Sequence, residues 1–377
     1  MLNLNRNLDG LRLGGIRRYT NLAKEVGGCV MLTLGEPEFD TPQPIRDACK
    51  EALELGRTHY TENRGEAAVR LAIAEFERQK RGLSYTAEEV ILTLGATEAI
   101  YIALAGVLNP GDQVVIPTPA FSLYDTAARL CGAEPVSLDT SGTCFQLTAE
   151  ALEKVLTPKT RLLILNSPNN PTGVIYSREN LEQIRQLVKE RDLFILCDDV
   201  YWGLSPCFTF TCFSDLKDRI LAVQSFSKPY AMTGWRIGYL MAQEEIAAKL
   251  NVIHSHTVTC APSMLQSACF AALKYDPTPM GRSYEERRAC VCRRLDKMGL
   301  PYTAPQGAFY VFPSIRHLGI ASGEFCTRMI REAKVATVPG SVFGTEGYFR
   351  MSYCCSPAEL TEGLNRLEHF ITILNRH

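Results

Sequence analysis

Short apolar runs of strand-like composition alternate with helix-like segments between Glu89 and Ala242, and this alternation constrains the fold more than any other feature. It is typical of a mostly parallel sheet flanked by helices. Several runs are apolar at every position, as expected for strands that helices cover on both faces. We therefore predict an α/β fold with strands at Val90–Leu94, Gln113–Pro117, Arg161–Asn166, Leu193–Asp198, Ile220–Gln224 and Ile237–Met241.

The pattern changes after about Pro262. A long helix is predicted from there to Leu295, followed by a strand at Gly307–Phe312, further helix, and a strand at Phe349–Tyr353. This mixture is typical of a smaller α+β domain, and a chain of 377 residues is long enough for two or three domains. We predict an N-terminal segment, residues 1–44, that contributes to the small domain, a large domain at 45–275, and a C-terminal small domain at 276–377.

Charge and composition exclude several classes of partner. Forty Lys and Arg residues balance 41 Asp and Glu residues, which leaves a net charge of -1 and no block of like charge. We therefore expect no nucleic acid partner and no membrane partner. The first residues lack the basic start and apolar stretch of a signal peptide, and no apolar run reaches transmembrane length. The expected location is the cytoplasm.

The cysteines and histidines do not predict a metal site. Fourteen cysteines are spread along the chain without any C-x-x-C pair, so reduced and mostly buried thiols are expected. His254 and His256 flank a serine, but neither has a carboxylate or thiol neighbour in sequence. We expect no bound metal.

The segment Ser225–Tyr239 contains the strongest chemical signal. A lysine amine condenses with a carbonyl to form a Schiff base, and Lys228 stands there among hydroxyl side chains. Ser225, Ser227 and Arg236 have the donors to bind an anionic phosphate. Taken alone, such a match is more often a solvated lysine and arginine on a loop, so the rest of the chain has to decide.

Other reactive residues also follow predicted strands. Ligands of parallel sheets bind outside the carboxyl ends of the strands, where Gly95, Asn170, Asp198 and Lys228 all fall. Gly95 begins a glycine turn into a helix, whose free amides and positive dipole end attract anions. Taken alone, the sequence of this turn would equally fit an ordinary strand-to-helix junction that binds no anion.

Asp198 ends an apolar strand, where a carboxylate is costly unless a cation or a donor pairs with it. A protonated ring nitrogen would be such a partner. Tyr201 could then donate to a phenolic oxygen on the same ring, and Phe121 could stack on it, although a single aromatic is usually part of the core.

Several motifs occur in order along the chain: Leu34–Pro42, Gly95–Thr97, Asn169–Gly173, Asp198–Tyr201, Ser225–Lys228 with Arg236, and Arg350. Together they strongly resemble the class I and II pyridoxal-phosphate aminotransferases of fold type I, over nearly the whole chain. The segments Gly15–Tyr19 and Gly307–Ile315 resemble most the bacterial aminotransferase A group, which includes N-acetyl-L,L-diaminopimelate aminotransferases. The resemblance implies a mostly parallel, seven-stranded central sheet with a smaller α+β domain.

The resemblance also implies a role for each matching residue. Lys228 would form the Schiff base with pyridoxal 5'-phosphate and carry the proton between the substrate α-carbon and the cofactor. Asp198 would keep the pyridine nitrogen protonated, Asn170 and Tyr201 would hold the ring oxygen, and Phe121 would stack on the ring. The phosphate would be bound by a set that we call the phosphate cup: Gly95, Ala96, Thr97, Ser225, Ser227 and Arg236.

Substrate and subunit contacts follow in the same way. Arg350 matches the arginine that grips the substrate α-carboxylate, with Gly35 and Asn170 assisting. Tyr60 resembles the tyrosine that reaches the phosphate of the neighbouring subunit, which implies a homodimer with shared active sites. Arg64 could bind a distal carboxylate, but a surface arginine of no special role is the commoner case.

Three positions depart from the commoner family pattern. Phe121 stands where many relatives have Tyr or Trp, Asp199 where Glu is commoner, and Pro229 where a small or polar residue is usual. None of these changes removes a catalytic group, but Pro229 could alter the backbone after Lys228.

The leading hypothesis is an aminotransferase that works by a ping-pong mechanism between an L-amino acid and a 2-oxo acid. A C–S β-lyase of the same fold is the alternative, because it needs the same lysine and cofactor. A cofactor-sensing domain of a transcription regulator would need a DNA-binding module, and the roughly 30 residues before Gly35 are too few for one. The amino acid itself cannot be read from the sequence, since pocket shape decides it.

Overall fold

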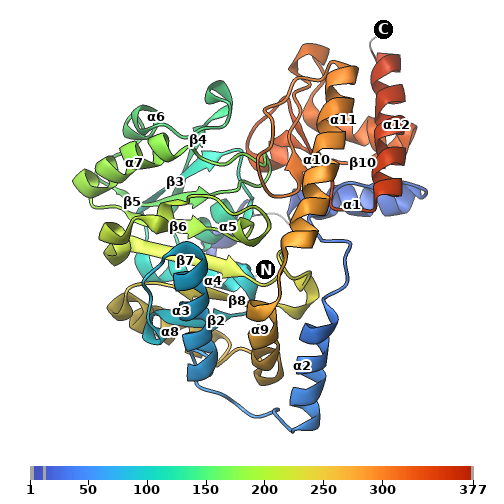
Figure 1. The fold of residues 1–377 in the computed structure, drawn as a ribbon. Helices are drawn as coiled ribbons and strands as arrows, with labels where there is room; N and C mark the ends of the chain where they lie inside the picture. Colours follow the sequence, from blue (N-terminus) through green and yellow to red (C-terminus); the bar gives the residue numbers. More distant parts are fainter. Residues whose placement is uncertain (1–3, 12–13, 375–377) are drawn as a thin grey trace.

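The computed structural model describes residues 4–11 and 14–374. Its centre is a seven-stranded sheet in the order β2-β8-β7-β6-β5-β3-β4 (Figure 1). Neighbouring strands pair in parallel except β8, which runs antiparallel to both β2 and β7. The predicted mostly parallel sheet of seven strands is therefore confirmed. The strands are β2 (Val90–Thr93), β3 (Gln113–Thr118), β4 (Glu134–Asp139), β5 (Thr160–Asn166), β6 (Phe194–Asp198), β7 (Ile220–Ser225) and β8 (Gly238–Met241).

Successive residues of the central strands enter two different hydrophobic cores. In β5, Leu162 and Ile164 face one core, whereas Leu163 and Leu165 face the other. The first core contains α4 (Gly95–Val107) and α5 (Leu123–Leu130); the second contains α3 (Ala67–Arg81), α7 (Arg178–Arg191) and α9 (Ser263–Lys274). Both faces of the sheet are thus covered, which explains the continuously apolar strands. Further helices of this part of the chain are α2 (Gln43–Glu54), α6 (Ala149–Glu153) and α8 (Glu244–Thr257).

Strand β4 is the one member of the sheet that the apolar pattern does not predict. It lies at the edge, pairs with no strand but β3 within the described part of the chain, and keeps most of its side chains exposed or half-buried. Because an edge strand with solvent contact needs no apolar run, its sequence Glu134–Asp139 carries charge and a proline.

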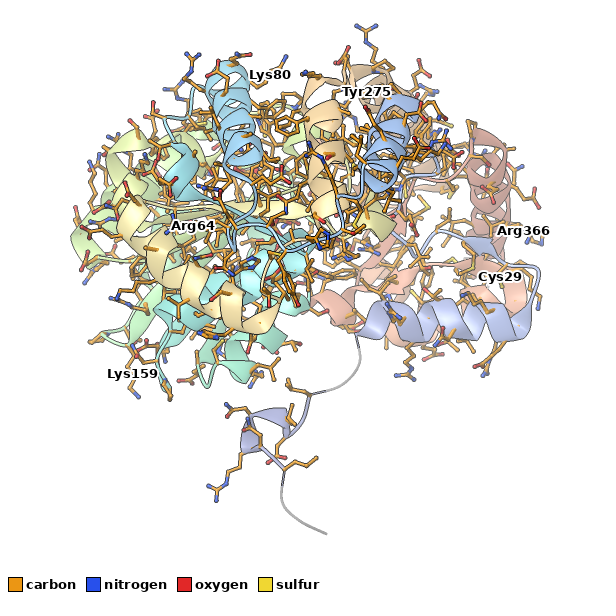
Figure 2. All side chains as sticks on the ribbon, turned by 90° about the horizontal axis from the view of Figure 1, so that it is seen from below. Cys29, Arg64, Lys80, Lys159, Tyr275 and Arg366 are labelled. Carbon is orange, nitrogen blue, oxygen red and sulfur yellow. The ribbon has the colours of Figure 1, made fainter. Side chains whose placement is uncertain are left out.

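The C-terminal part forms a second group of elements beside the central sheet (Figure 1). Strand β12 lies between β11 and β9, antiparallel to both, and β1 pairs in parallel with β10. Arg366 donates to the carbonyl of Gly28 at 3.0 Å, so the C-terminal helix holds the segment of Cys29, which lies beside it in Figure 2. The domain boundaries stay predictions. These elements are β1 (Val30–Met31), β9 (Tyr310–Val311), β10 (Val335–Ala336), β11 (Val338–Pro339), β12 (Phe349–Ser352), α1 (Gly15–Val26), α10 (Thr278–Met298), α11 (Ser322–Arg328) and α12 (Pro357–Leu374).

The prediction of one helix from Pro262 to Leu295 is wrong. Helix α9 ends at Lys274 and α10 begins at Thr278. Pro277 stands between them, and a proline without an N–H interrupts a helix but suits the start of a new one. The strand predicted at Gly307–Phe312 is only the two-residue β9, because its first residues form a turn against the loop at Gly173.

Composition alone predicted the state of the thiols incompletely. All 14 cysteines are unpaired, but only Cys197, Cys269, Cys326 and Cys354 are buried, so the expectation of mostly buried thiols is wrong. Within the described residues, no helix has both the length and the apolar character that a membrane crossing requires.

Candidate active site

A cavity of about 390 Å³ opens at the carboxyl ends of β5, β6 and β7. Its walls come from the central sheet and α4, from the N-terminal part, and from β9 and β12. Of the predicted site residues, Gly95 and Tyr60 do not line it. Those that do are Gly35, Ala96, Thr97, Phe121, Asn170, Asp198, Tyr201, Ser225, Ser227, Lys228, Arg236 and Arg350.

Lys228 follows β7 and points its amine across the cavity towards the N-terminal part. Its Nζ donates to the carbonyl oxygen of Gly35 at 2.6 Å. Burial lowers the pKa of Lys228 to about 8. A larger fraction of the amine is therefore neutral near physiological pH, and the neutral form is the one that attacks a carbonyl.

Asp198 ends β6 and is 4% exposed. The hydroxyl of Tyr124 donates to its Oδ2 at 2.6 Å, and the backbone N–H of Val200 donates to Oδ1 at 3.3 Å. Burial raises the pKa of Asp198 to about 6, although both hydrogen bonds oppose the rise. The carboxyl group is thus ionised at neutral pH, and Oδ1, with only a long bond, can accept from a further donor.

The phosphate cup has the geometry of an anion site at a helix N-terminus. Gly95 begins α4 with φ +74°, and a Cβ there would come within 2.6 Å of the guanidinium of Arg236, so glycine is required. Beside it, the hydroxyl of Ser225 donates to that of Ser227 at 2.9 Å. The N–H groups of Ala96 and Thr97 lie in the first turn of α4, where intrahelical acceptors are absent.

Arg350, on β12, is 1% exposed, and its guanidinium is held on several sides. It donates to Oδ1 of Asn170 at 2.8 Å and to the carbonyl of Thr33. Its Cζ lies over the Tyr310 ring, 4.4 Å from the ring centre. Among the described residues its Nε has no hydrogen-bond partner, so the buried cation keeps a donor for an anion.

Three further residues take part in this arrangement without a role predicted from the sequence. Asn166 donates to the carbonyl of Asp198 at 2.8 Å and accepts from the N–H of Asn170 at 2.8 Å, so it joins two strand ends. Tyr310 shares a hydrogen bond of 2.9 Å with Tyr201. Tyr124 supports Asp198, as described. All three lie within or beside motifs that the sequence singles out, which was the available signal.

Tyr60 and Arg64 lie outside the cavity. Tyr60 is 86% exposed. Arg64 donates to the carbonyl of Glu88 at 2.5 Å and forms an ion pair with its carboxylate at 3.4 Å, in the part of the molecule that carries the central sheet (Figure 2).

The unusual Asp199 points away from the cavity. Its carboxylate is buried, forms an ion pair with Arg81, and accepts from the hydroxyls of Thr209 at 3.0 Å and Thr211 at 2.7 Å. Asp199 therefore belongs to a buried polar network behind the site. Phe121 does line the cavity, where its ring packs edge-on against Tyr124.

The family described as aminotransferase class I and II matches residues 28–367. This chain belongs to that family. The predicted family, fold, transamination activity and dependence on pyridoxal phosphate are thereby confirmed.

Similar aminotransferases are named for different substrates. A probable N-acetyl-LL-diaminopimelate aminotransferase of Bacillus subtilis is 40% identical, over 98% of this chain and 95% of the relative. Aromatic-amino-acid aminotransferase 2 of Thermococcus litoralis is 39% identical, over 97% of each chain. Among solved structures, the aspartate aminotransferase of Thermotoga maritima superposes with a TM-score of 0.93 at 35% identity, over 98% of this chain and 100% of its own.

The cavity of this aminotransferase fits pyridoxal phosphate on its own chemistry. Its donor set comprises helix amides, two hydroxyls and a guanidinium, which suit a phosphate dianion. The buried carboxylate of Asp198, whose Oδ1 accepts only a long hydrogen bond, suits a protonated ring nitrogen. The amine of Lys228, with its lowered pKa, suits an aldehyde. Each part of the cofactor has a matching group in one cavity.

Proposed function

We propose that this aminotransferase exchanges an amino group between an L-amino acid and a 2-oxo acid by a ping-pong mechanism, with Lys228, Asp198 and Arg350 in the leading roles. The observation that carries the proposal is the convergence of these three residues on one cavity that five residues of the phosphate cup also line: Ala96, Thr97, Ser225, Ser227 and Arg236. Transamination by such a route needs only one substrate site, used twice.

Each residue has a separate task in this proposal. When bound, pyridoxal phosphate supplies an electron-withdrawing ring that makes loss of the substrate Cα proton feasible. Lys228 is the attachment point for the cofactor and, as a free amine, takes the proton from Cα and returns it. Asp198 holds a proton on the ring nitrogen, and Asn170 and Tyr201 hold the ring oxygen. Phe121 covers one face of the ring.

Gly35 and Arg350 bind the substrate α-carboxylate, with Asn170 orienting the guanidinium through its 2.8 Å hydrogen bond. Since Arg350 is already fixed by Asn170 and Thr33, it loses little freedom on binding. A fixed carboxylate orients the Cα–H bond for proton removal.

Arg350→Lys should lower kcat/KM for every amino donor by roughly 2–4 kcal/mol, because an ammonium cannot offer two parallel N–H donors to the carboxylate. Cofactor content should stay normal. The measurement is steady-state kinetics with several donors, with Arg328→Lys as a control, since Arg328 does not line the cavity and forms an i,i+4 pair with Glu332 near the surface. A loss confined to one class of donor would contradict a role at the α-carboxylate, which all donors share.

We further propose a homodimer in which Tyr60 of each subunit completes the phosphate site of the other. An 86% exposed tyrosine on a loop otherwise bonded to the body of the chain is well placed for a partner. Large apolar side chains exposed on neighbouring elements support such an interface. They are Leu53, Leu55, Leu71, Tyr101 and Val252.

Mixing Lys228→Ala subunits with Tyr60→Phe subunits should recover activity above that of either parent, because one of the two sites in the mixed dimer would then be undamaged. The measurement is activity after subunit exchange, with exchange confirmed by differently tagged subunits. Confirmed exchange without recovery would argue against shared sites.

A screen of amino donors against 2-oxo acids tests the function and its alternative together. The aminotransferase should turn over only when an acceptor is present, whereas a C–S β-lyase would release pyruvate and ammonia from a sulfur-bearing donor without one. Aspartate, aromatic amino acids and N-acetyl-L,L-diaminopimelate should all be included, since similar proteins are named for these substrates. The cytoplasm remains the proposed location.

A further inference from the structure

His254, on α8, is fully buried and bridges two segments that the proposed function uses in different subunits. Its Nδ1 lies 2.6 Å from Oε1 of Glu98, in the first turn of α4. Its Nε2 lies 2.8 Å from the carbonyl oxygen of Asn63. The ring thus contacts a carboxylate oxygen on one side and a backbone carbonyl oxygen on the other.

The Glu98 side of the bridge leads to the phosphate cup. The second carboxylate oxygen of Glu98 accepts from the backbone N–H of Leu94 at 2.5 Å. Leu94 directly precedes Gly95, where β2 turns into α4. Glu98 therefore fixes the turn that presents the N–H groups of Ala96 and Thr97 to the cavity, and His254 fixes Glu98.

The Asn63 side leads to the segment at residues 57–66, which we call the Tyr60 loop. The side chain of Asn63 donates to the carbonyl of Thr259 at 2.8 Å, and the carbonyl of Arg64 accepts from the N–H of Leu92 at 2.9 Å. Tyr60 stands three residues before Asn63 and is exposed. The loop is thus fastened on one side of Tyr60 by His254 and its neighbours, while Tyr60 itself points outward.

We propose that His254 is a positioning residue that joins the phosphate cup of its own subunit to the loop that serves the partner's site. This inference rests on the shared-site dimer proposed above. Cofactor affinity at one site then depends on two histidines: the one in the same chain, through Glu98, and the one in the partner, through Asn63. Neither histidine touches the cofactor.

Two substitutions separate the halves of the bridge. The amide nitrogen of asparagine falls near the place of Nδ1, so His254→Asn keeps the bond to Glu98 and loses the bond to Asn63. The longer glutamine places its amide near Nε2, so His254→Gln does the reverse. His256, exposed on the same helix, provides matched controls as His256→Asn and His256→Gln.

Mixed dimers assign each effect to a site. One chain carries Lys228→Ala, so borohydride can fix the cofactor only in the site of the other chain. The measured quantity is the pyridoxal phosphate concentration that half-saturates this fixation, with thermal unfolding of each variant as a check on folding. The histidine variant is placed either on the chain with Lys228, in cis, or on the Lys228→Ala chain, in trans.

We expect His254→Gln to raise the half-saturating concentration about tenfold in cis and hardly at all in trans, and His254→Asn to do the opposite, since each variant loses one hydrogen bond involving a charged or buried partner. The His256 controls should match the wild type. Equal effects in cis and in trans, or no effect in either, would contradict the proposed role of His254.

Tyr60→Phe in trans serves as the reference that separates the two proposals. If it weakens fixation while the histidine variants have no effect on it, the proposed role of His254 is wrong and the shared-site dimer is retained. If it has no effect, the shared-site dimer is wrong, and the trans half of the inference falls with it.

Discussion

Lys228→Ala should abolish transamination with every amino donor, because in the proposed mechanism Lys228 both holds the cofactor and moves the Cα proton. Among the residues that the structure describes, Lys228 is the one lysine that lines the cavity. The wild-type protein should be yellow, and borohydride reduction followed by peptide mapping should find the cofactor on Lys228. Lys154→Ala, which removes a surface pair with Glu150, should leave activity unchanged. Label on a different lysine would refute the assignment.

The pKa of Lys228 adds a second measurement. Because burial lowers it to about 8, the amine becomes neutral above that pH, whereas an ordinary lysine does so only above about 10.4. Covalent capture of pyridoxal phosphate by the apoenzyme should therefore speed up as the pH rises towards 8 and level off beyond it. A rate that keeps rising well past pH 9 would show that the amine is not perturbed.

Much of the fold was predictable because burial on both faces leaves a mark in the sequence. The strands that became β5, β6 and β7 were found as apolar runs, since helices cover both of their faces. Edge strand β4 left no such mark, because solvent tolerates its polar residues. The two-residue strands β1, β10 and β11 are too short for any period to appear.

The site was predictable for a different reason. Parallel strands bring their carboxyl ends to one edge, so residues just after them, such as Asp198 and Lys228, had to meet. The contacts of Tyr124 and His254 could not be foreseen, since they join residues 74 and 156 positions apart through side-chain directions that no local pattern encodes. For Tyr60 the sequence resemblance predicts a contact that a single chain does not contain, because the predicted partner lies in a second subunit.

Asp198→Asn should keep the fold and still bind cofactor, yet lower kcat about a hundredfold or more. Asparagine fills the same space and can keep the hydrogen bond from Tyr124, 2.6 Å long in the wild type, but it carries no charge to hold a proton on the ring nitrogen. The ring then withdraws electrons less strongly when charge develops at Cα. Asp192→Asn is a suitable control, because Asp192 is exposed and its backbone, at φ 52°, tolerates asparagine.

The raised pKa of Asp198 gives this prediction a pH signature. The carboxyl group is charged above about 6 and neutral below it, so its attraction for a protonated ring is present above that pH and lost as the pH falls through it. Cofactor affinity of the wild-type apoenzyme should therefore drop below pH 6 more steeply than that of Asp198→Asn. Because titration of the cofactor itself contributes to both pH profiles, comparing the two proteins removes that contribution. Parallel pH profiles, or near-normal turnover in the variant, would remove Asp198 from the mechanism.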